Sequence, residues 1–279
     1  KIKPAKLTKV TLAETSKQHT RSELTFGVKE VKAGNLIVPT DGYTVSGNTK
    51  TGVGSYQATV TGTGNYEGEV KATYHIVASD VTLVTSDTQA SEITDLDGHY
   101  ILTENVSASV FANLYDATNP FTGTLDGDMY SISGLSSHAL FNKIDGGTVK
   151  NVILDDVNIS GGTNVGAIAN EATGATRIYN CGILSGSVGG SGDVGGLVGK
   201  LNNTSNPKAG ARVINCFSYA KITGGNNVGG IVGNNTFAST ATDIRTMVMN
   251  CMFYGDIENG TNVSPVYGGT NIANLQSGL

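Results

Sequence analysis

The 279-residue sequence predicts an all-β protein, made of a small β-sandwich followed by a right-handed parallel β-helix (solenoid). Three observations predict this fold: a turn-rich composition, short alternating strands in the first 78 residues, and a repeat in the second half. Glycine supplies 38 of the 279 residues, well above an average usage of about 7%. Glycine and Asn favour tight turns, whereas Val, Ile and Thr favour strands. Helical periodicity is hard to find.

Charge and hydropathy exclude several classes of protein. The net charge is −5, so nucleic acid is not an expected partner, because phosphate binding needs clustered Lys and Arg. The lysines near the start are interpreted as a solvated chain end. No apolar stretch reaches the roughly 18 residues of a membrane helix, so no membrane insertion is expected. The sequence begins with Lys1, and we expect a monomeric piece of a longer multidomain chain.

Residues 1–78 are predicted to form the sandwich. Strands that alternate apolar and polar residues recur at the spacing of a β-sandwich. The predicted strands are Lys6–Leu12, Leu24–Val31, Tyr43–Ser46, Tyr56–Thr61 and Val70–Ile76. Between them lie the turn signals Ala33-Gly34-Asn35, Pro39-Thr40-Asp41-Gly42 and Thr63-Gly64-Asn65. Ala78–Ser91 is expected to hold the linker and the first strand of a second domain, residues 79–279.

The last strands of the first domain resemble those of bacterial Ig-like modules. These modules often carry the pattern G-x-Y-x-x-x-V-x-G-x-G-N-Y. The matching residues are Gly54, Tyr56, Val60, Gly62, Gly64, Asn65 and Tyr66. The resemblance implies an Ig-like sandwich in which these positions are structural.

A repeat dominates the second domain. Four segments align, beginning at Thr148, Arg177, Arg212 and Met247. Their anchors are Asn151, Asn180, Asn215 and Asn250, spaced by 29, 35 and 35 residues, and each is followed 13 or 14 residues later by Val165, Val194, Val228 or Val263. Such a period indicates stacked units that bury apolar faces on each other. Short strands between Gly and Asn turns favour a β-helix over helical repeats or a propeller.

The anchors predict two columns along the stack. Parallel strands lie about 4.8 Å apart, so the Asn side chains are expected to form a hydrogen-bonded ladder at the corners. Cys181, Cys216 and Cys251 follow three of the four Asn residues. Two interpretations stay open for this second column. It forms a disulfide or a metal site, or it is a stack of buried reduced thiols, which the absence of a nearby His or a C-x-x-C motif favours.

The glycine-rich segments Gly195-Gly196-Leu197-Val198-Gly199 and Gly229-Gly230-Ile231-Val232-Gly233 resemble the GLUG motif of bacterial surface proteins. The upstream segment, residues 121–149, resembles the region that commonly precedes such repeats. It carries Phe121, Gly123, Leu125, Asp126, Gly127, Ile132, Gly134, Leu140, Phe141, Ile144 and Val149. Similar segments occur in large cell-wall proteins of gut and mucosal bacteria, including some IgA-cleaving metallopeptidases. The last repeat has Ser264-Pro265-Val266-Tyr267-Gly268 instead, and this departure suggests a fading or capping coil.

The resemblance implies an extracellular location and a fold more than an activity. Metallopeptidases of that kind carry an H-E-x-x-H zinc helix. The four histidines here, His19, His75, His99 and His138, lack that spacing. We therefore predict no cofactor and a non-enzymatic surface or adhesion module.

A carbohydrate-active enzyme, a polysaccharide lyase or hydrolase, is the alternative, because many β-helices cleave polysaccharides with paired carboxylates. The local candidates are Asp126 with Asp128, and Asp155 with Asp156. The first pair flanks an Asp-Gly turn signal. Adjacent residues on a strand point to opposite faces, so Asp155 and Asp156 are not expected to act together.

Aromatic residues provide a candidate ligand-binding surface. Tyr179, Phe217, Tyr219, Phe253 and Tyr254 fall at similar positions in successive repeats. Facing outward, they would form a stacking strip for a host glycan or a host surface protein. Alternation cannot place both Phe253 and Tyr254 outward, so part of the set is expected in the core. The polar insertions Asn202–Gly210 and Phe237–Arg245 are further candidates for partner recognition.

Overall fold

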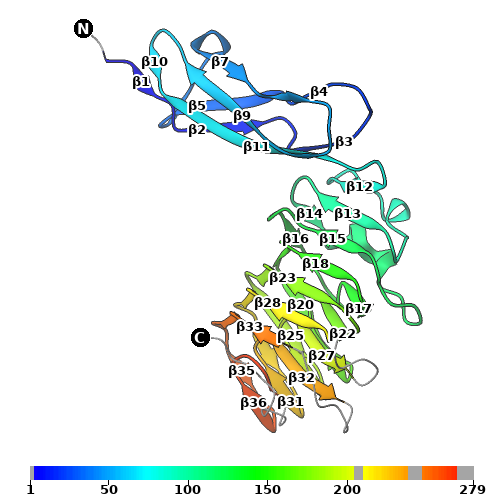
Figure 1. Cartoon of the computed structure of the whole chain (residues 1–279). Helices are drawn as coiled ribbons and strands as arrows, with labels where there is room; N and C mark the ends of the chain where they lie inside the picture. The colour runs from blue at the N-terminus through cyan, green and yellow to red at the C-terminus, as the bar shows by residue number, and fades with distance from the viewer. Residues whose placement is uncertain (1–2, 204–209, 238–246, 269–279) are drawn as a thin grey trace. The chain divides into compact units, whose positions relative to one another are not determined.

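The computed structural model describes residues 3–203, 210–237 and 247–268. The chain divides into two compact units, Lys1–Leu83 and Val84–Leu279, and each is described by itself (Figure 1). The prediction of an all-β protein is confirmed. Across these described ranges the helical elements are three short 3-10 helices: η1 (Thr40–Gly42), η2 (Ala90–Glu92) and η3 (Ala108–Leu114).

The first unit contains four small sheets. The largest has the order β3-β11-β9-β7, with β3 (Ser16–Gln18), β11 (Glu69–Val77), β9 (Gly54–Gly62) and β7 (Tyr43–Ser46). A second sheet consists of β2 (Lys9–Leu12), β5 (Val28–Ala33) and β6 (Leu36–Ile37). Two strand pairs complete the unit, β1 (Ala5–Lys6) with β10 (Tyr66–Glu67) and β4 (Leu24–Thr25) with β8 (Thr49–Lys50).

Two predicted strands are divided because the chain changes its pairing partner. The predicted strand from Lys6 to Leu12 becomes β1, which pairs in parallel with β10, and β2, which pairs antiparallel with β5. The predicted strand from Leu24 to Val31 is interrupted at Phe26, whose side chain is fully buried, between β4 and β5. Periodicity reports which face is buried, whereas the partner of a strand depends on the tertiary fold.

The core of the first unit joins its two larger sheets. Val10 and Val31 of the three-stranded sheet pack in one cluster with Val60 of β9. In a second cluster the rings of Phe26 and Tyr74 stack with centroids 4.1 Å apart. The Tyr74 hydroxyl donates to the carbonyl of Gly47 at 2.6 Å, so the buried phenol is hydrogen-bonded, as buried polar groups generally are.

The second unit is a stack of coils that pair in parallel. We use "coil" for one repeat of this stack; the coils at residues 148–173, 177–203 and 212–237 contribute one strand to each of five sheets in turn. Sheet 1 contains β12 (Val81–Val84), β13 (His99–Leu102), β15 (Thr124–Asp126), β18 (Thr148–Lys150), β23 (Arg177–Tyr179), β28 (Arg212–Ile214) and β33 (Met247–Met249). Sheet 2 contains β14 (Val106–Ser107), β16 (Ser131–Ser133), β19 (Ile153–Asp155), β24 (Gly182–Ile183), β29 (Phe217–Ser218) and β34 (Met252–Phe253).

The three remaining sheets have four strands each. Sheet 3 contains β20 (Val157–Ile159), β25 (Gly186–Gly189), β30 (Lys221–Thr223) and β35 (Ile257–Glu258). Sheet 4 contains β21 (Asn164–Val165), β26 (Asp193–Gly195), β31 (Asn227–Gly229) and β36 (Asn262–Ser264). Sheet 5 contains β17 (Phe141–Asp145), β22 (Ala169–Thr173), β27 (Val198–Asn203) and β32 (Val232–Phe237).

The register of the coils matches the alignment of the repeats. The four segment starts, Thr148, Arg177, Arg212 and Met247, are successive pairing partners in sheet 1. The four aligned valines, Val165, Val194, Val228 and Val263, are successive partners in sheet 4. The repeat therefore predicts which residues lie side by side between coils that are 29 or 35 residues apart.

The interior of the stack is one apolar cluster that runs from Val84 to Tyr267. Tyr267 pairs with Val232 and lies buried in the departing last repeat. Its hydroxyl accepts from the backbone N–H of Asn235 at 3.1 Å. Burial raises the pKa of Tyr267. Tyr267 stands where the preceding coils have Val232 and Val198. Its larger side chain thus fills the core in the last described coil, which fits a capping role.

The predicted Asn ladder is present. Asn151, Asn180, Asn215 and Asn250 have φ angles of 54°, 55°, 55° and 49°, in the left-handed region that Asn tolerates better than most residues. Each side-chain amide donates to the Asn oxygen of the preceding coil, at 3.2 Å, 3.3 Å and 3.2 Å. The first, Asn151, donates instead to Asp126 at 2.9 Å. The corner between sheets 1 and 2 is thereby fixed in these four coils.

Substitution of Asn215 separates the two contributions of a ladder residue. Asn215→Gly keeps the left-handed backbone accessible and removes the amide, so we expect a loss of about 1 kcal/mol in the free energy of unfolding. Asn215→Ala adds the backbone penalty and is expected to cost about 2 kcal/mol. Urea titration followed by circular dichroism measures both.

Asn259 provides the matched control, because its φ is 64° and its side chain has no hydrogen bond to the described part of the chain. Asn259→Gly is expected to leave the free energy of unfolding within about 0.5 kcal/mol of the parent value. Equal losses at Asn215 and Asn259 on replacement by Gly would contradict the ladder's role.

Candidate functional site

The outer face of sheet 2 carries an exposed apolar surface. The Asn corner sets the side-chain phase: the Cys that follows points inward, the next residue outward, and the alternation continues. The outward residues in the later coils are Leu184, Phe217, Tyr219, Met252 and Tyr254, which we name the outer aromatic patch. Leu184 is 48% exposed, Tyr219 44%, Met252 51% and Tyr254 77%. Large apolar side chains are therefore gathered on one face instead of scattered.

Ring contacts connect the patch along and across the coils. The rings of Phe217 and Tyr219 meet edge to face with centroids 5.7 Å apart, and those of Tyr219 and Tyr254 at 5.9 Å. Phe217 pairs with Gly182 in the preceding coil. A Cβ atom at Gly182 would lie 2.2 Å from the Phe217 ring, so the ring occupies the space that a side chain would need. Glycine at this position makes room for the patch.

Two of the five predicted aromatic residues lie elsewhere. Phe253 is half-buried and packs against the core, as alternation requires once Tyr254 faces outward. Tyr179 lies on sheet 1, before the Asn corner, where it is half-buried on the outer face of β23. The predicted set therefore divides into Phe217, Tyr219 and Tyr254 in the patch, and two residues outside it. The insertions Asn202–Gly210 and Phe237–Arg245 lie largely outside the described residues.

The carboxylate candidates have structural partners. Asp126 Oδ2 forms an ion pair with Lys150 Nζ at 2.8 Å, while Asp126 Oδ1 accepts from Asn151 and from the backbone N–H of Asp128. Burial opposes the charge of Lys150, but the hydrogen bond to Asp126 and its negative charge raise the pKa of the lysine overall. Asp126 thus begins the Asn ladder and is already occupied by its partners.

The second carboxylate pair is not arranged for joint action on a substrate. Asp155 accepts from the Ser185 hydroxyl at 2.6 Å and from the backbone N–H of Asp156 at 3.0 Å. Asp156 occupies a left-handed turn with φ 53° and is exposed. The first residue therefore fastens two coils together, and the second forms the turn between sheets 2 and 3.

The cysteines form the predicted column beneath the Asn corner. All three are free thiols. Cys181, Cys216 and Cys251 donate to the carbonyls two residues earlier, at 3.3 Å, 3.2 Å and 3.2 Å. The contact with Cys181, partly opposed by Cys251, raises the pKa of Cys216, and burial raises it further. The contact with Cys216, followed by burial, raises the pKa of Cys251. No cluster with metal-ligand composition occurs among the described residues.

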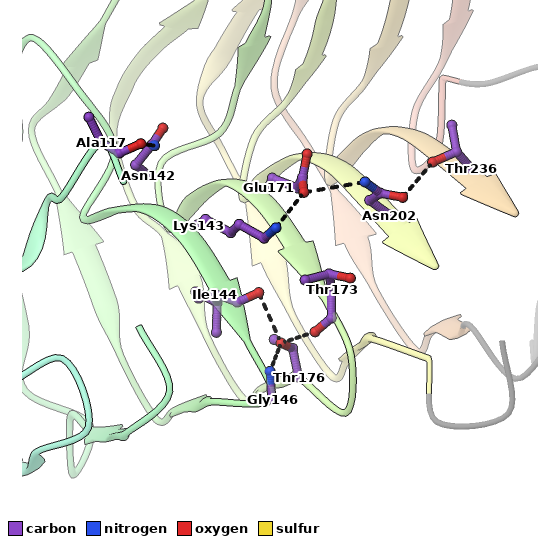
Figure 2. A network of polar contacts seen from close by, with 10 residues as sticks. All are labelled: Ala117, Asn142, Lys143, Ile144, Gly146, Glu171, Thr173, Thr176, Asn202 and Thr236. Atoms are coloured by element: carbon purple, nitrogen blue, oxygen red, sulfur yellow. Dashed lines mark hydrogen bonds and ion pairs between the residues drawn. The ribbon is translucent and has the colours of Figure 1, made fainter. Parts of the chain in front are cut away.

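A polar groove of about 530 Å³ lies over sheet 5. Beside the groove, polar side chains of neighbouring strands in sheet 5 contact one another (Figure 2). Lys143 forms an ion pair with Glu171 at 3.4 Å. Asn202 donates to Glu171 at 3.3 Å, and Thr236 donates to Asn202 at 3.3 Å. Glu171 is the one carboxylate that lines the groove. A single paired carboxylate does not supply the acid and base of glycoside hydrolysis, so the groove offers hydrogen bonding instead.

Buried polar contacts hold the edge of the same sheet. The Thr176 hydroxyl donates to the carbonyls of Thr173 and Ile144, at 2.5 Å and 3.3 Å, and accepts from the backbone N–H of Gly146 at 3.0 Å (Figure 2). On the other side of the groove Asn142 donates to the carbonyl of Ala117 at 3.4 Å. The Thr176 contacts connect neighbouring coils at the edge of sheet 5, whereas Asn142 and Ala117 both line the groove.

Comparison with known proteins finds similarity to the N-terminal region of a group of bacterial proteases. Residues 88–184 match the model for the N-terminal region of the M26 IgA1-specific metallo-endopeptidases. An immunoglobulin A1 protease of Streptococcus sanguinis is 35% identical over 201 residues, which cover 64% of this chain and 10% of that protein. Residues 88–184 are thus similar to the N-terminal region of these proteases, and the chain spans about a tenth of the streptococcal protein's length.

Two further comparisons extend the list of similar proteins. Halomucin of Haloquadratum walsbyi is 38% identical over 96 residues, covering 32% of this chain and 1% of that protein. A solved structure of an IgA1 protease aligns with a TM-score of 0.47 at 18% identity, covering 91% of this chain and 25% of that one. Among the described residues, no helix has the length and apolar character needed to cross a membrane.

The partners of Asp126 predict the effect of its substitution. Asp126→Asn removes the charge that pairs with the partly exposed Lys150, so we expect a loss of about 1 kcal/mol in the free energy of unfolding. Asp156→Asn is the matched control and is expected to be neutral. Neither variant is expected to alter reducing-end release from mucin glycans or plant polysaccharides, which should be flat for the parent chain. Release that disappears in Asp126→Asn would instead identify a carbohydrate-active enzyme.

The raised pKa values of Cys216 and Cys251 predict low reactivity of these two thiols. Because the thiolate is the reactive form, Cys216 and Cys251 are expected to stay protonated and react slowly with iodoacetamide at pH 8. Mass spectrometry after timed labelling should show little modification of the folded chain and three alkylated cysteines after denaturation in urea. Rapid labelling of Cys216 in the folded chain would show that the column is open to solvent.

Proposed function

We propose that this chain is a non-enzymatic extracellular module in the N-terminal region of a larger bacterial surface protein. In this proposal the first unit is an Ig-like β-sandwich, and the second is a right-handed parallel β-helix with GLUG-type repeats. The module presents the outer aromatic patch to a host protein. The single observation that carries the binding role is the gathering of Tyr219, Met252 and Tyr254, each more than two-fifths exposed, on one sheet face.

The composition of the patch favours a protein partner over a neutral glycan. Aromatic residues and Met are enriched in the cores of protein interfaces. Its rings meet edge to face, and Leu184 and Met252 lie beside them. This surface is irregular and apolar, unlike a flat ring on which one sugar would stack. A glycan is therefore the second choice for this patch.

The similarity to immunoglobulin A1 proteases suggests immunoglobulin A1 as the first partner to test. The matched region is the N-terminal one, and the sequence lacks an H-E-x-x-H motif. These observations support a module that binds or positions a substrate for a catalytic neighbour in the same protein. The enzyme alternative has less support, since Asp126 and Asp155 both have structural partners.

Binding to purified immunoglobulin A1 and to mucin, measured on a biosensor, tests the proposal. We expect binding of the parent chain, weakened by about 2 kcal/mol or roughly thirtyfold in Tyr219→Ala/Tyr254→Ala. Both side chains are on the surface, so the melting temperature should change little.

The matched control is Leu36→Ala/Ile37→Ala, which removes side chains that are 62% and 68% exposed in the first unit. This control is expected to bind as the parent does. Failure of the parent chain to bind either partner, or equal binding by the patch variant, would overturn the binding role and leave a display scaffold.

A further inference from the structure

Two arginines lie side by side on the outer face of sheet 1. Arg177 and Arg212 are direct pairing partners in neighbouring coils, about 4.8 Å apart along the stack. Each is half-buried, and the next residue of each strand, Ile178 or Val213, points into the core. Among the described residues no carboxylate forms an ion pair with either guanidinium. Like charges at this separation repel each other, so the pair requires an explanation.

Arg177 is fixed in place by the backbone. One terminal nitrogen donates to the carbonyls of Ala175, Thr176 and Gly210, at 2.8 Å, 2.9 Å and 3.1 Å. Burial, followed by the charge of Arg212, lowers the pKa of Arg177. No neighbouring anion among the described residues offsets these two causes.

Arg212 has an unused donor. Its Nε is buried and has no hydrogen-bond partner. A buried N–H without an acceptor is unfavourable, and native structures usually provide a partner from the protein, water or a ligand. The guanidinium fork of arginine suits two-point binding of a carboxylate or sulfate group. The pair therefore has the charge of an anion site, and its unpaired donor, the Arg212 Nε, lies beneath the surface.

The surroundings of the pair suggest what carries the anion. Thr148 precedes Arg177 in the same column, and Tyr179 lies two residues along β23 on the same outer face. Lys150 and Asp126 neutralise each other beyond Tyr179, so the two arginines are the unbalanced charge of this face. A hydroxyl, an aromatic ring and two cations in one surface are suited to an acidic sugar, which offers hydroxyls, an apolar ring face and an anionic group.

We propose that the Arg177–Arg212 pair, with Tyr179, binds an acidic monosaccharide unit of a glycan. The guanidinium groups hold its carboxylate or sulfate, and Tyr179 contacts the sugar ring. This site lies on sheet 1, apart from the outer aromatic patch on sheet 2, and does not depend on it. Tyr179, assigned from the sequence to an aromatic strip, functions here beside the arginines.

Isothermal titration of the whole chain with four probes tests the site: 3′-sialyllactose, sulfated lactose, neutral lactose and inorganic sulfate. We expect both acidic sugars to bind, more tightly than inorganic sulfate, and lactose to show no measurable heat. Arg212→Gln should weaken binding of the acidic sugars by roughly tenfold or more. Arg212→Lys, which keeps the charge without the fork, should weaken it nearly as much.

Lys29→Gln is the matched control, because it removes one positive charge at an exposed position of the first unit. It should bind as the parent does, and melting temperatures should show that Arg212→Gln is folded. If Arg212→Gln does not fold, Tyr179→Ala replaces it and should weaken the sugars but not inorganic sulfate.

Several results would overturn the proposal. If neither acidic sugar binds, the proposed site is wrong. Equal binding of sulfate and sulfated lactose, or tighter binding of an acidic peptide than of sialyllactose, would exclude a saccharide ligand. An unchanged affinity in Arg212→Gln would show that the sugar binds elsewhere.

Discussion

Four successive coils of the second unit depend on a left-handed Asn at the corner between sheets 1 and 2. Asn151, Asn180, Asn215 and Asn250 adopt positive φ angles, and their amides bond from coil to coil. The backbone bend alone would leave each corner free to slip. The amide ladder connects the corners, so the strands on both sides keep one register. Because side chains alternate along a strand, a slip of one residue would exchange core and surface. In these four coils the corner therefore fixes which side chains of sheets 1 and 2 point into the core.

In-register stacking has a chemical consequence, namely that residues of one kind accumulate in columns. An Asn column satisfies itself, since each amide is both donor and acceptor. A Cys column is neutral and small, and each thiol donates to a nearby carbonyl. An Arg column cannot satisfy itself, because guanidinium has donors only. An aromatic column on the outer face leaves apolar area in water. The Arg212 Nε and the outer aromatic patch stay without a partner among the described residues, and for this reason both proposed binding sites are placed on such columns.

The sequence predicts much of the second unit and less of the site. The Asn and Val anchors alone give the pairing register of four coils, as the partners Arg177 and Arg212 show. The first unit is harder, because the strand from Lys6 to Leu12 changes partner in the middle, and no local pattern encodes partner choice. For the aromatic residues, the sequence itself contains the direction of each side chain. Counting from the corner Asn places Phe253 inward and Tyr254 outward. Tyr179 precedes its Asn and therefore belongs to another sheet.

The arginine pair had a weaker signal, a basic residue at the same position of two aligned repeats. A search of the sequence for carboxylates beside basic residues does not find this pair, because neither arginine forms an ion pair with a carboxylate among the described residues. Sequence reasoning detects groups that are present together. An unpartnered Nε becomes visible only when burial and hydrogen bonds are known.

The glycines beneath the aromatic residues distinguish a built surface from incidental exposure. The Phe217 ring fills the space where a Cβ at Gly182 would lie, so the aromatic residue in one coil requires glycine in the coil before it. The half-buried Phe253, which lies outside the patch, likewise occupies the space of a Cβ at Gly230, 2.1 Å from its ring. A surface residue that arose by chance would lean into solvent and constrain nothing. Here the preceding coil has a glycine, without a side chain, where the ring lies. This dependence between neighbouring coils connects the glycine-rich composition to the position of the patch.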